Sequence, residues 1–244
     1  MYTAVVTGGT SGIGKEISRQ FLERGDTVIA VYKSDDKKAK ETTTEFNNPR
    51  FSTVKLDITN EVAVKKFFCG LKQCDYLINC AGITHPWTPL SDTDLTEAKR
   101  VFDVNFFAKM NCAKYALDLL KKSNRPRIIN IASRFGVRPL KPGTYAYSCS
   151  EAAIIMMTGC LALDYAKFGV RTNTISPSYT LTPMTKGKAS DNYEKVAETI
   201  ASLNPLKRIG KPEDVAGLVM FLCSDSADYI NGENINVNGG VLLQ

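Results

Sequence analysis

The sequence has few of the residues on which metal centres and disulfide scaffolds depend. Among its 244 residues there is one histidine, His85, which argues against a histidine-rich metal site. The seven cysteines form no C-x-x-C pair, their odd number leaves one without a partner, and most lie in apolar segments. These features are typical of reduced thiols rather than of disulfides. We therefore expect neither a bound metal nor a disulfide.

The sequence also has no apolar run near the length that crosses a bilayer, no linker and no internal repeat. Hydrophobic residues make up 43% of the chain, which is enough for one large core without a second domain. The formal net charge of +6 comes from lysines and arginines spread along the chain, as on a solvated surface. We therefore predict one domain over residues 1–244, in the cytoplasm, with neither nucleic acid nor membrane as a partner.

Short apolar segments alternate with longer amphipathic segments along the chain. This alternation predicts βαβ units and a seven-stranded parallel sheet with helices on both faces, an α/β fold. We expect strands at residues 3–7, 27–31, 51–56, 75–79, 127–132, 170–175 and 234–237, and helices at 13–23, 37–46, 62–71, 98–120, 147–168 and 212–222. The main departure is the irregular stretch 176–206, which contains three prolines and is a candidate substrate loop or lid. Its composition is equally typical of a surface loop without a role.

A glycine-rich turn follows the first expected strand. Gly8, Gly12 and Gly14 have the spacing G-x-x-x-G-x-G, and the last two open the first expected helix. Backbone amides and the helix dipole can bind a phosphate at such a position, and glycine permits the close approach. A tight turn without a ligand also favours glycine. The location after the first strand of a βαβ series favours a dinucleotide site.

Thr7-Gly8-x-x-x-Gly12-x-Gly14 resembles the T-G-x-x-x-G-x-G signature of the short-chain dehydrogenase/reductase family. Further motifs of that family follow in order over nearly the whole length. NCAG at residues 79–82 is similar to its N-N-A-G motif, and RIGKPEDVAGLVMFLCSD and INGENINVNGG are similar to its closing helix and strand. The chain resembles in particular the 3-oxoacyl-carrier-protein reductases of this family.

The resemblance implies a Rossmann-like, doubly wound sheet with a nicotinamide cofactor across the carboxyl ends of its strands. Asp57 and Ile58 would then contact the adenine, residues 79–82 would pass the adenosine ribose, and Thr180 and Thr182 would lie near the carboxamide. The cofactor contacts implied are Gly8, Thr10, Ser11, Gly12, Ile13, Gly14, Tyr32, Lys33, Ser34, Asp57, Ile58, Asn79, Ala81, Gly82, Tyr147, Pro177, Thr180 and Thr182.

The end of the second expected strand bears on the choice of cofactor. NAD-preferring relatives have an acid there, whereas this chain has Tyr32, followed by Lys33 and Ser34. Lys33 is a candidate partner for a 2′-phosphate, although a solvated loop lysine would look the same. Ser11 stands where many NADP-using relatives have a base. We favour NADP and keep NAD as the alternative.

Ketone reduction by hydride requires a proton donor at the carbonyl oxygen and a second donor that holds this oxygen. Ser133 and Tyr147 match the serine and tyrosine that do so in the family, and Asn105 matches its active-site asparagine. By this resemblance Ser133 would orient the substrate oxygen and Tyr147 would exchange its proton. Taken alone, Ser133 would be read as a helix cap and Tyr147 as a packing residue.

Residue 151 departs from the family pattern Y-x-x-x-K, because Glu151 stands where the lysine is expected. In the family that ammonium binds the nicotinamide ribose and favours the phenolate. Glu151 can accept from ribose hydroxyls, but an ionised carboxylate would raise the pKa of Tyr147, at about 1.4 kcal/mol per pKa unit. Catalysis persists if Glu151 is protonated in a buried site, or if a base approaches from the loop that contains Arg134, Arg138 and Lys141.

Three functions follow from what Glu151 does. The first is reduction of a small or carrier-tethered ketone to a secondary alcohol, with hydride from NADPH and a proton from Tyr147. The second is a weakened or inactive relative that binds cofactor as the partner of an active subunit. The third is non-redox chemistry, a dehydration or isomerisation with Glu151 and Tyr147 as acid and base.

The two longest expected helices contain more apolar residues than one face of a sheet needs. Relatives commonly pair such helices, so we expect a homo-oligomer, either a dimer or a tetramer. The residues concerned are Val101, Phe102, Phe106, Phe107, Met110, Ile154, Ile155, Met156, Met157 and Leu161.

Overall fold

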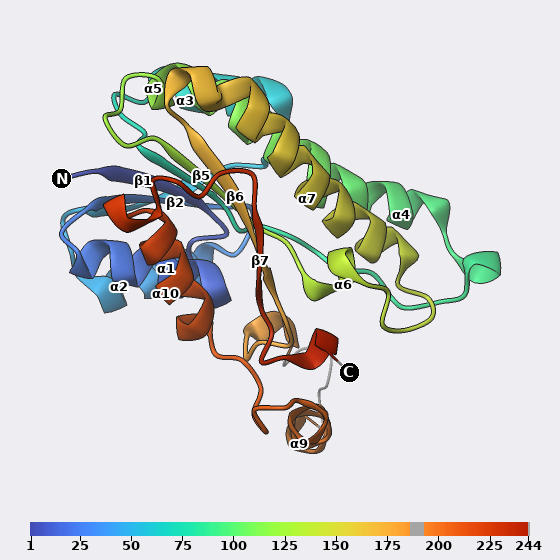
Figure 1. Ribbon diagram of the computed structural model, residues 1–244. Coiled ribbons are helices and arrows are strands. Elements are labelled where there is room, and N and C mark those ends of the chain that lie inside the picture. The colour runs from blue at the N-terminus through green and yellow to red at the C-terminus, as the bar shows by residue number, and fades with distance from the viewer. Residues whose placement is uncertain (186–192, 244) are drawn as a thin grey trace.

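Seven parallel strands form one sheet in the order β3-β2-β1-β4-β5-β6-β7 in the computed structural model, which describes residues 1–185 and 193–243 (Figure 1). The chain begins in the middle of the sheet, builds one half outward, and returns to build the other, which is the doubly wound arrangement. The predicted α/β fold is confirmed, and each expected strand forms within two residues of its expected ends. The strands are β1 Thr3–Thr7, β2 Thr27–Tyr32, β3 Phe51–Lys55, β4 Tyr76–Asn79, β5 Arg127–Ile131, β6 Arg171–Pro177 and β7 Asn234–Val237.

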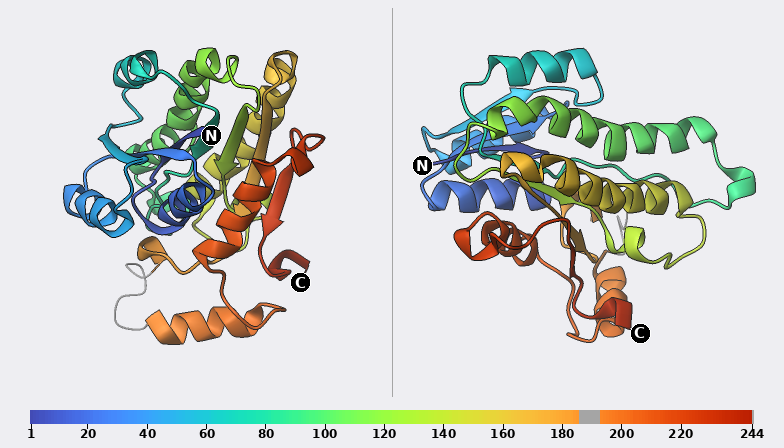
Figure 2. Two further views of the ribbon diagram at one scale, coloured as in Figure 1. Left: turned by 90° about the vertical axis from the view of Figure 1, so that its left-hand side faces the viewer. Right: turned by 45° about the horizontal axis from the view of Figure 1, so that its top comes forward.

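Helices cover both faces of the sheet (Figures 1 and 2). The helices α1 (Gly12–Glu23), α2 (Asp36–Phe46) and α10 (Pro212–Leu222) lie on one face. The helices α3 (Glu61–Gly70), α4 (Leu95–Phe102), α5 (Ala108–Leu120) and α7 (Tyr145–Tyr165) lie on the other. Short 3-10 helices occur at Leu90–Asp92, Ala166–Phe168, Asp225–Ala227 and Val241–Leu243.

Each face of the sheet has its own apolar core. Along β1, Ala4 and Val6 belong to the core beneath α1 and α10, whereas Val5 belongs to the core beneath α3, α5 and α7. Successive side chains of a strand point to opposite faces, so a strand that is covered on both sides is apolar at every position. The continuous run TAVVT is therefore a buried central strand rather than an alternating one.

The helix expected at residues 98–120 contains a π-helical segment. It begins three residues earlier than expected, as α4, passes through η2 (Asp103–Phe107) and continues as α5. A π-helical turn inserts an extra residue and often marks a functional position. Here it contains Asn105, one of the predicted site residues, which is fully buried.

The apolar helix α7 begins at Tyr145 and continues through the 3-10 turn to Phe168. By length and composition alone it would suffice to cross a membrane, so the expectation that no apolar stretch approaches that length was wrong. Ile154, Met157 and Leu161 are buried, and Met157 and Leu161 belong to the core of the sheet. The segment is therefore a core helix and not a membrane span.

The irregular stretch 176–206 begins inside β6 and ends after α9 (Tyr193–Leu203). Residues 186–192 of the predicted lid lie outside the described residues. The described part of this stretch includes α9, which lies apart from the sheet (Figure 1). Residues of α9 help to line a cavity together with Trp87 and Phe135.

Candidate active site

The glycine turn between β1 and α1 has the backbone shape that its sequence predicts. Gly8 and Gly12 have φ values of 70° and 52°, in the left-handed region that favours glycine. A Cβ atom on Gly14 would lie 2.3 Å from the carbonyl oxygen of Gly8, so no side chain fits there. Ser11 is the N-cap of α1, and its side chain caps no amide of the described residues. The first amides of α1 are therefore available to an anion such as a pyrophosphate.

Thr7 holds the glycine turn against the end of β4. Its Oγ1 accepts hydrogen bonds from the backbone nitrogens of Cys80 and Ala81, at 3.0 and 3.1 Å. The turn and the N-C-A-G segment thus form two walls of a cavity of about 290 Å³, which we call the cofactor cleft. The predicted residues that line it are Gly8, Ser11, Gly12, Ile13, Gly14, Ala81, Gly82, Tyr147, Glu151 and Thr182.

The residues predicted to contact the adenosine part of the cofactor form an ion pair and a hydrogen bond at the ends of β2 and β3. Lys33, the candidate for a 2′-phosphate, forms an exposed ion pair with Asp57 at 2.8 Å. This pairing lowers the pKa of the Asp57 carboxyl, although partial burial opposes the effect. Tyr32 donates to Asp36 at 3.0 Å. Lys33 and Asp57 thus meet where β2 and β3 end, and a 2′-phosphate there would compete with Asp57 for the Lys33 ammonium.

Other residues that were predicted to contact the cofactor are buried and stabilise the strand ends next to the cofactor cleft. Asn79 is buried and donates to Oδ1 of Asn130 at 2.9 Å, which ties β4 to β5. Thr10 is buried, and its carbonyl oxygen accepts from Thr42. Ile58 belongs to the apolar core. These residues hold the strand ends in place, while Ser34 is exposed beyond them.

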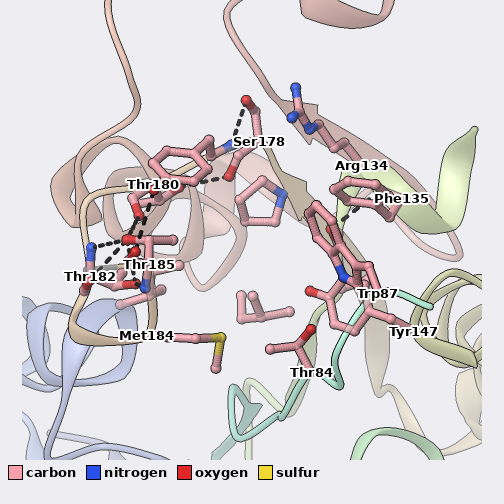
Figure 3. A pocket seen from close by; sticks show the side chains of 16 residues that line it. Thr84, Trp87, Arg134, Phe135, Tyr147, Ser178, Thr180, Thr182, Met184 and Thr185 are labelled. Carbon is pink, nitrogen blue, oxygen red and sulfur yellow. Dashed lines mark hydrogen bonds between the residues drawn. The ribbon is translucent and has the colours of Figure 1, made fainter. Parts of the chain in front are cut away.

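A second cavity, of about 160 Å³, adjoins the cofactor cleft, and we call it the junction cavity (Figure 3). Pro177, Ser178, Thr180 and Thr182 line it, with Ser133 and Tyr147 among the remaining lining residues. In Figure 3 Tyr147, Phe135 and Trp87 lie on one side, and Thr180, Thr182 and Met184 lie on the other. Ile13, Tyr147 and Thr182 line both cavities, so the two share a wall.

The two predicted catalytic hydroxyls meet at this wall. Ser133 is the N-cap of the short helix α6 (Arg134–Val137), and its Oγ accepts from the backbone nitrogen of Phe135 at 3.3 Å. Tyr147 lies in the first turn of α7 and interacts with the Ser133 hydroxyl. Burial raises the pKa of Tyr147 above its usual value, as does the charge of Glu151, whereas Ser133 and Arg134 lower it. The phenol is therefore neutral at physiological pH.

Asn105 is near the site but lines neither cavity. Its Nδ2 donates to the carbonyl oxygen of Ile83 at 3.0 Å and to Oε1 of Glu151 at 3.1 Å, and its Oδ1 accepts from the nitrogen of Ile83 at 2.8 Å. The asparagine thereby fixes both the segment after β4 and the carboxylate of Glu151.

Glu151 is 3% exposed, and burial raises its pKa to about 7. Lys109 of α5 and the hydrogen bond from Asn105 act in the opposite direction. The expectation of a buried acid with a raised pKa is thus confirmed. Of the three bases expected from the loop, Arg134 does approach the site, where its charge lowers the pKa of Tyr147.

Lys109 is the functional candidate that the sequence did not reveal. It is 1% exposed, lines the cofactor cleft, and donates from Nζ to the carbonyl oxygen of Ile131 at 2.6 Å. Burial lowers its pKa, whereas Glu151 raises it. A signal was available: the lysine interrupts an apolar segment and lies four residues after Asn105, on the same helix face.

A third cavity, of about 690 Å³, adjoins the junction cavity and extends towards α9; we call it the outer cavity. Its walls include Trp87, Phe135 and Ile200, and its charged lining residues are Arg134 and Lys141. Among the described residues that line it there is no acid. Within residues 1–185 and 193–243, no group of three His, Cys, Asp or Glu side chains could hold a metal.

Known proteins are similar to this chain in both sequence and fold. Residues 8–242 match the family model described as enoyl-(acyl carrier protein) reductase. The chain belongs to the short-chain dehydrogenase/reductase family. It is 33% identical to an uncharacterized oxidoreductase of Thermotoga maritima, over 97% of this chain and 95% of that protein. The ligand-free aldohexose dehydrogenase of Thermoplasma acidophilum superposes with a TM-score of 0.90 at 30% identity, covering 100% of this chain and 94% of that one. ElxO with NADP bound gives a TM-score of 0.90 at 28% identity, covering 100% and 99% of the two chains.

As a short-chain dehydrogenase/reductase, the protein is an oxidoreductase that depends on NAD(P). The cofactor cleft fits such a group, because its glycine cradle excludes a Cβ atom at Gly14 and leaves the first amides of α1 open. The family assignment made from the sequence is confirmed. In this member of the family, Glu151 and Lys109 line the cofactor cleft together with Tyr147.

Proposed function

We propose that the protein reduces a ketone to a secondary alcohol with NADPH. The observation that supports this most directly is the position of Tyr147, which lines both the cofactor cleft and the junction cavity. A proton donor at that wall stands between a cofactor and a substrate. ElxO, a structural neighbour, binds NADP, which favours NADP over NAD here.

The residues present suit the reductive direction. When bound, the nicotinamide cofactor supplies the hydride that the carbonyl carbon accepts. Tyr147 gives its proton to the carbonyl oxygen, since its raised pKa keeps the phenol neutral beforehand. Ser133 accepts a hydrogen bond from Phe135, and its hydroxyl interacts with Tyr147, so it lies where it would donate to the same carbonyl oxygen. Arg134 lowers the pKa of Tyr147 and so stabilises the phenolate that remains.

We propose further that the preferred ketone has an acidic group, either on a small molecule or on a carrier. Arg134 and Lys141 give the outer cavity a positive potential, and no described acid in its lining offsets it. Lys141 lies over the ring of Trp87 at 5.3 Å, and Arg134 lies over Phe135 at 5.5 Å. A carboxylate or phosphate held there leaves the carbonyl of the same molecule within the junction cavity.

The test is NADPH oxidation over a panel of neutral and acidic ketones with wild type, Tyr147→Phe and Ser133→Ala. We expect wild type to reduce an acidic ketone, Tyr147→Phe to lose about 10²- to 10⁴-fold in kcat, and Ser133→Ala about 10²- to 10³-fold. Tight NADPH binding without turnover would favour the inactive partner subunit. Conversion of a hydroxy or enoyl substrate without NADPH oxidation would favour Glu151 and Tyr147 as the acid and base of a non-redox reaction.

We propose that the protein forms a homo-oligomer through α5 and α7. Large apolar side chains are exposed on both: Met110 in α5 with Phe107 directly before it, and Met156 and Leu163 in α7. Exposed apolar groups of this size favour burial against another chain. Light scattering should give the mass of a dimer or tetramer, and Met156→Lys with Leu163→Lys should shift it to the monomer.

A further inference from the structure

Two buried side chains of opposite charge line the cofactor cleft. Lys109 reaches it from α5 and Glu151 from α7, and they are 1% and 3% exposed. An unpaired charge at such a depth is strongly destabilising, and burial alone would discharge each group. Each partly offsets the effect of burial on the other, because Glu151 raises the pKa of Lys109 and Lys109 lowers that of Glu151, although burial is the larger effect in both.

The two groups are held in place by different partners. Nζ of Lys109 donates to the carbonyl oxygen of Ile131 at 2.6 Å, at the end of β5. Oε1 of Glu151 accepts from Nδ2 of Asn105 at 3.1 Å. The positive group is thus fixed to the sheet and the negative group to the π-helical segment. Lys109 and Glu151 thus line one cleft without a direct ion pair between them in the described chain, and each is held by its own hydrogen bond.

One oxygen of this pair has no partner. Within residues 1–185 and 193–243, Oε2 of Glu151 is buried and accepts no hydrogen bond. A buried acceptor left in this state is costly, and a donor supplied by a ligand removes the cost. The cleft in which Glu151 lies is the one that fits the nicotinamide cofactor, whose ribose hydroxyls are donors.

We propose that Lys109 and Glu151 act as one exchanged charge unit, in which Lys109 supplies from α5 the cation that relatives supply from position 151, while Glu151 accepts a cofactor hydroxyl through Oε2. This proposal depends on the proposed function in one respect, namely that the ligand is NADP(H). Lys109 is a positioning residue, since it acts on the phenol by neutralising Glu151. The exchange explains how an acid is tolerated four residues after the catalytic tyrosine.

The proposal reverses the simplest expectation about position 151. If Glu151 had replaced the family lysine without any compensating change, Glu151→Lys would raise the melting temperature and strengthen NADPH binding. If Lys109 already supplies the cation, Glu151→Lys brings two ammonium groups into one buried site. The double variant Lys109→Met/Glu151→Lys instead has one cation, at the family position. The double variant Lys109→Met/Glu151→Met has neither charge and no acceptor.

The experiment measures the melting temperature without cofactor and the NADPH dissociation constant by fluorescence, for wild type and these variants. Glu151→Lys and Lys109→Met should each lower the melting temperature by roughly 5 to 10 °C, as expected when one partner of a buried pair is removed. Glu151→Lys should also weaken NADPH binding at least tenfold. Lys109→Met/Glu151→Lys should recover both quantities, with a dissociation constant within about threefold of wild type.

The apolar double variant separates the two roles of the pair. Lys109→Met/Glu151→Met should keep the melting temperature near that of wild type but weaken NADPH binding at least tenfold, because the acceptor is gone. A matched control is Lys114→Met on the same helix, where the lysine forms an exposed pair with Glu61. It should change neither quantity.

Three results would overturn the proposal. The first is Glu151→Lys with an unchanged melting temperature and unchanged NADPH binding. The second is a double variant that is no better than the worse single variant. The third is a wild type that binds no NADPH, which would remove the ligand from the unit. Failure of the proposed function would look different, since wild-type NADPH binding and the recovery in the double variant would remain while no ketone is reduced.

Discussion

Arg134 gives the most direct test of substrate charge. The residue follows Ser133, one of the predicted catalytic residues, and lines both the junction cavity and the outer cavity. Its guanidinium lies over Phe135 and forms no ion pair with any acid of the described chain. Burial lowers its pKa, which means that the charge is partly desolvated and lacks a fixed counter-ion. A substrate anion would restore that counter-ion.

The magnitude follows from the strength of a charge-assisted hydrogen bond. Such a bond contributes about 1.5 to 3 kcal/mol, and about 1.4 kcal/mol corresponds to a tenfold change in rate. Arg134→Met should therefore lower kcat/KM for an acidic ketone by roughly 10- to 150-fold. The same variant should lower kcat/KM for the neutral amide of that ketone by a smaller factor, because only the stabilisation of the Tyr147 phenolate by Arg134 is then lost. Lys141 is exposed, so Lys141→Met should show the same selectivity with a smaller loss.

The assay compares NADPH oxidation with the acid and its amide, which differ little in size. Arg138→Met is the matched control, because Arg138 lies on the same loop, is exposed and lines neither cavity. It should leave both substrates unaffected. An equal loss for the acid and the amide in Arg134→Met would mean that the guanidinium supports the site without reading charge. A wild-type preference for the amide would refute the substrate class itself.

Two further predictions concern the turn and the buried acid. Gly14→Ala should abolish measurable NADPH binding, because the added Cβ would lie 2.3 Å from the carbonyl oxygen of Gly8. The control is Gly217→Ala in α10, where a Cβ has open space; it should raise the melting temperature by roughly 2 to 4 °C. The folded-state pKa of Glu151, about 7, exceeds its ordinary value of 4.5, so its contribution to stability is present below about pH 4.5 and is lost as pH rises towards 7. Urea unfolding of Glu151→Gln between pH 5 and 7.5 should therefore show a weaker fall in stability than wild type, by up to about 3 kcal/mol. A wild-type stability that falls no more steeply over this interval than that of the variant would contradict the raised pKa.

The fold could be predicted from the sequence because each element has a local signature. TAVVT reads as a strand that is buried on both sides, and Ala4 and Val5 do enter opposite cores. The glycine turn could be predicted for the same reason. The carbonyl oxygen of Gly8, only six residues away in sequence, leaves no room for a side chain at Gly14. Ser133 and Tyr147 were found by resemblance, and the structure brings them to one wall.

The electrostatics of the site depend on tertiary contacts and could not be predicted in the same way. Lys33 was considered for a phosphate, but whether Asp57 would reach it depends on how β2 and β3 end side by side. Lys109 follows the π-helical segment, and the extra residue of that segment sets which side of α5 faces the sheet. A local pattern places a lysine on a helix but does not say that its Nζ meets the carbonyl oxygen of Ile131.

The acid at position 151 bears on the direction of the proposed reaction. A lysine beside the tyrosine leaves a net positive charge that favours the phenolate, whereas Glu151 with Lys109 leaves none. Tyr147 consequently has a pKa above its usual value, with burial as the largest cause and Glu151 as the next. Oxidation of an alcohol begins with the phenolate as base and is slowed by this shift, but reduction begins with the neutral phenol that the shift maintains. The raised pKa of Tyr147 therefore supports the proposed reduction at neutral pH, in which Arg134, by lowering that pKa, would stabilise the phenolate that forms.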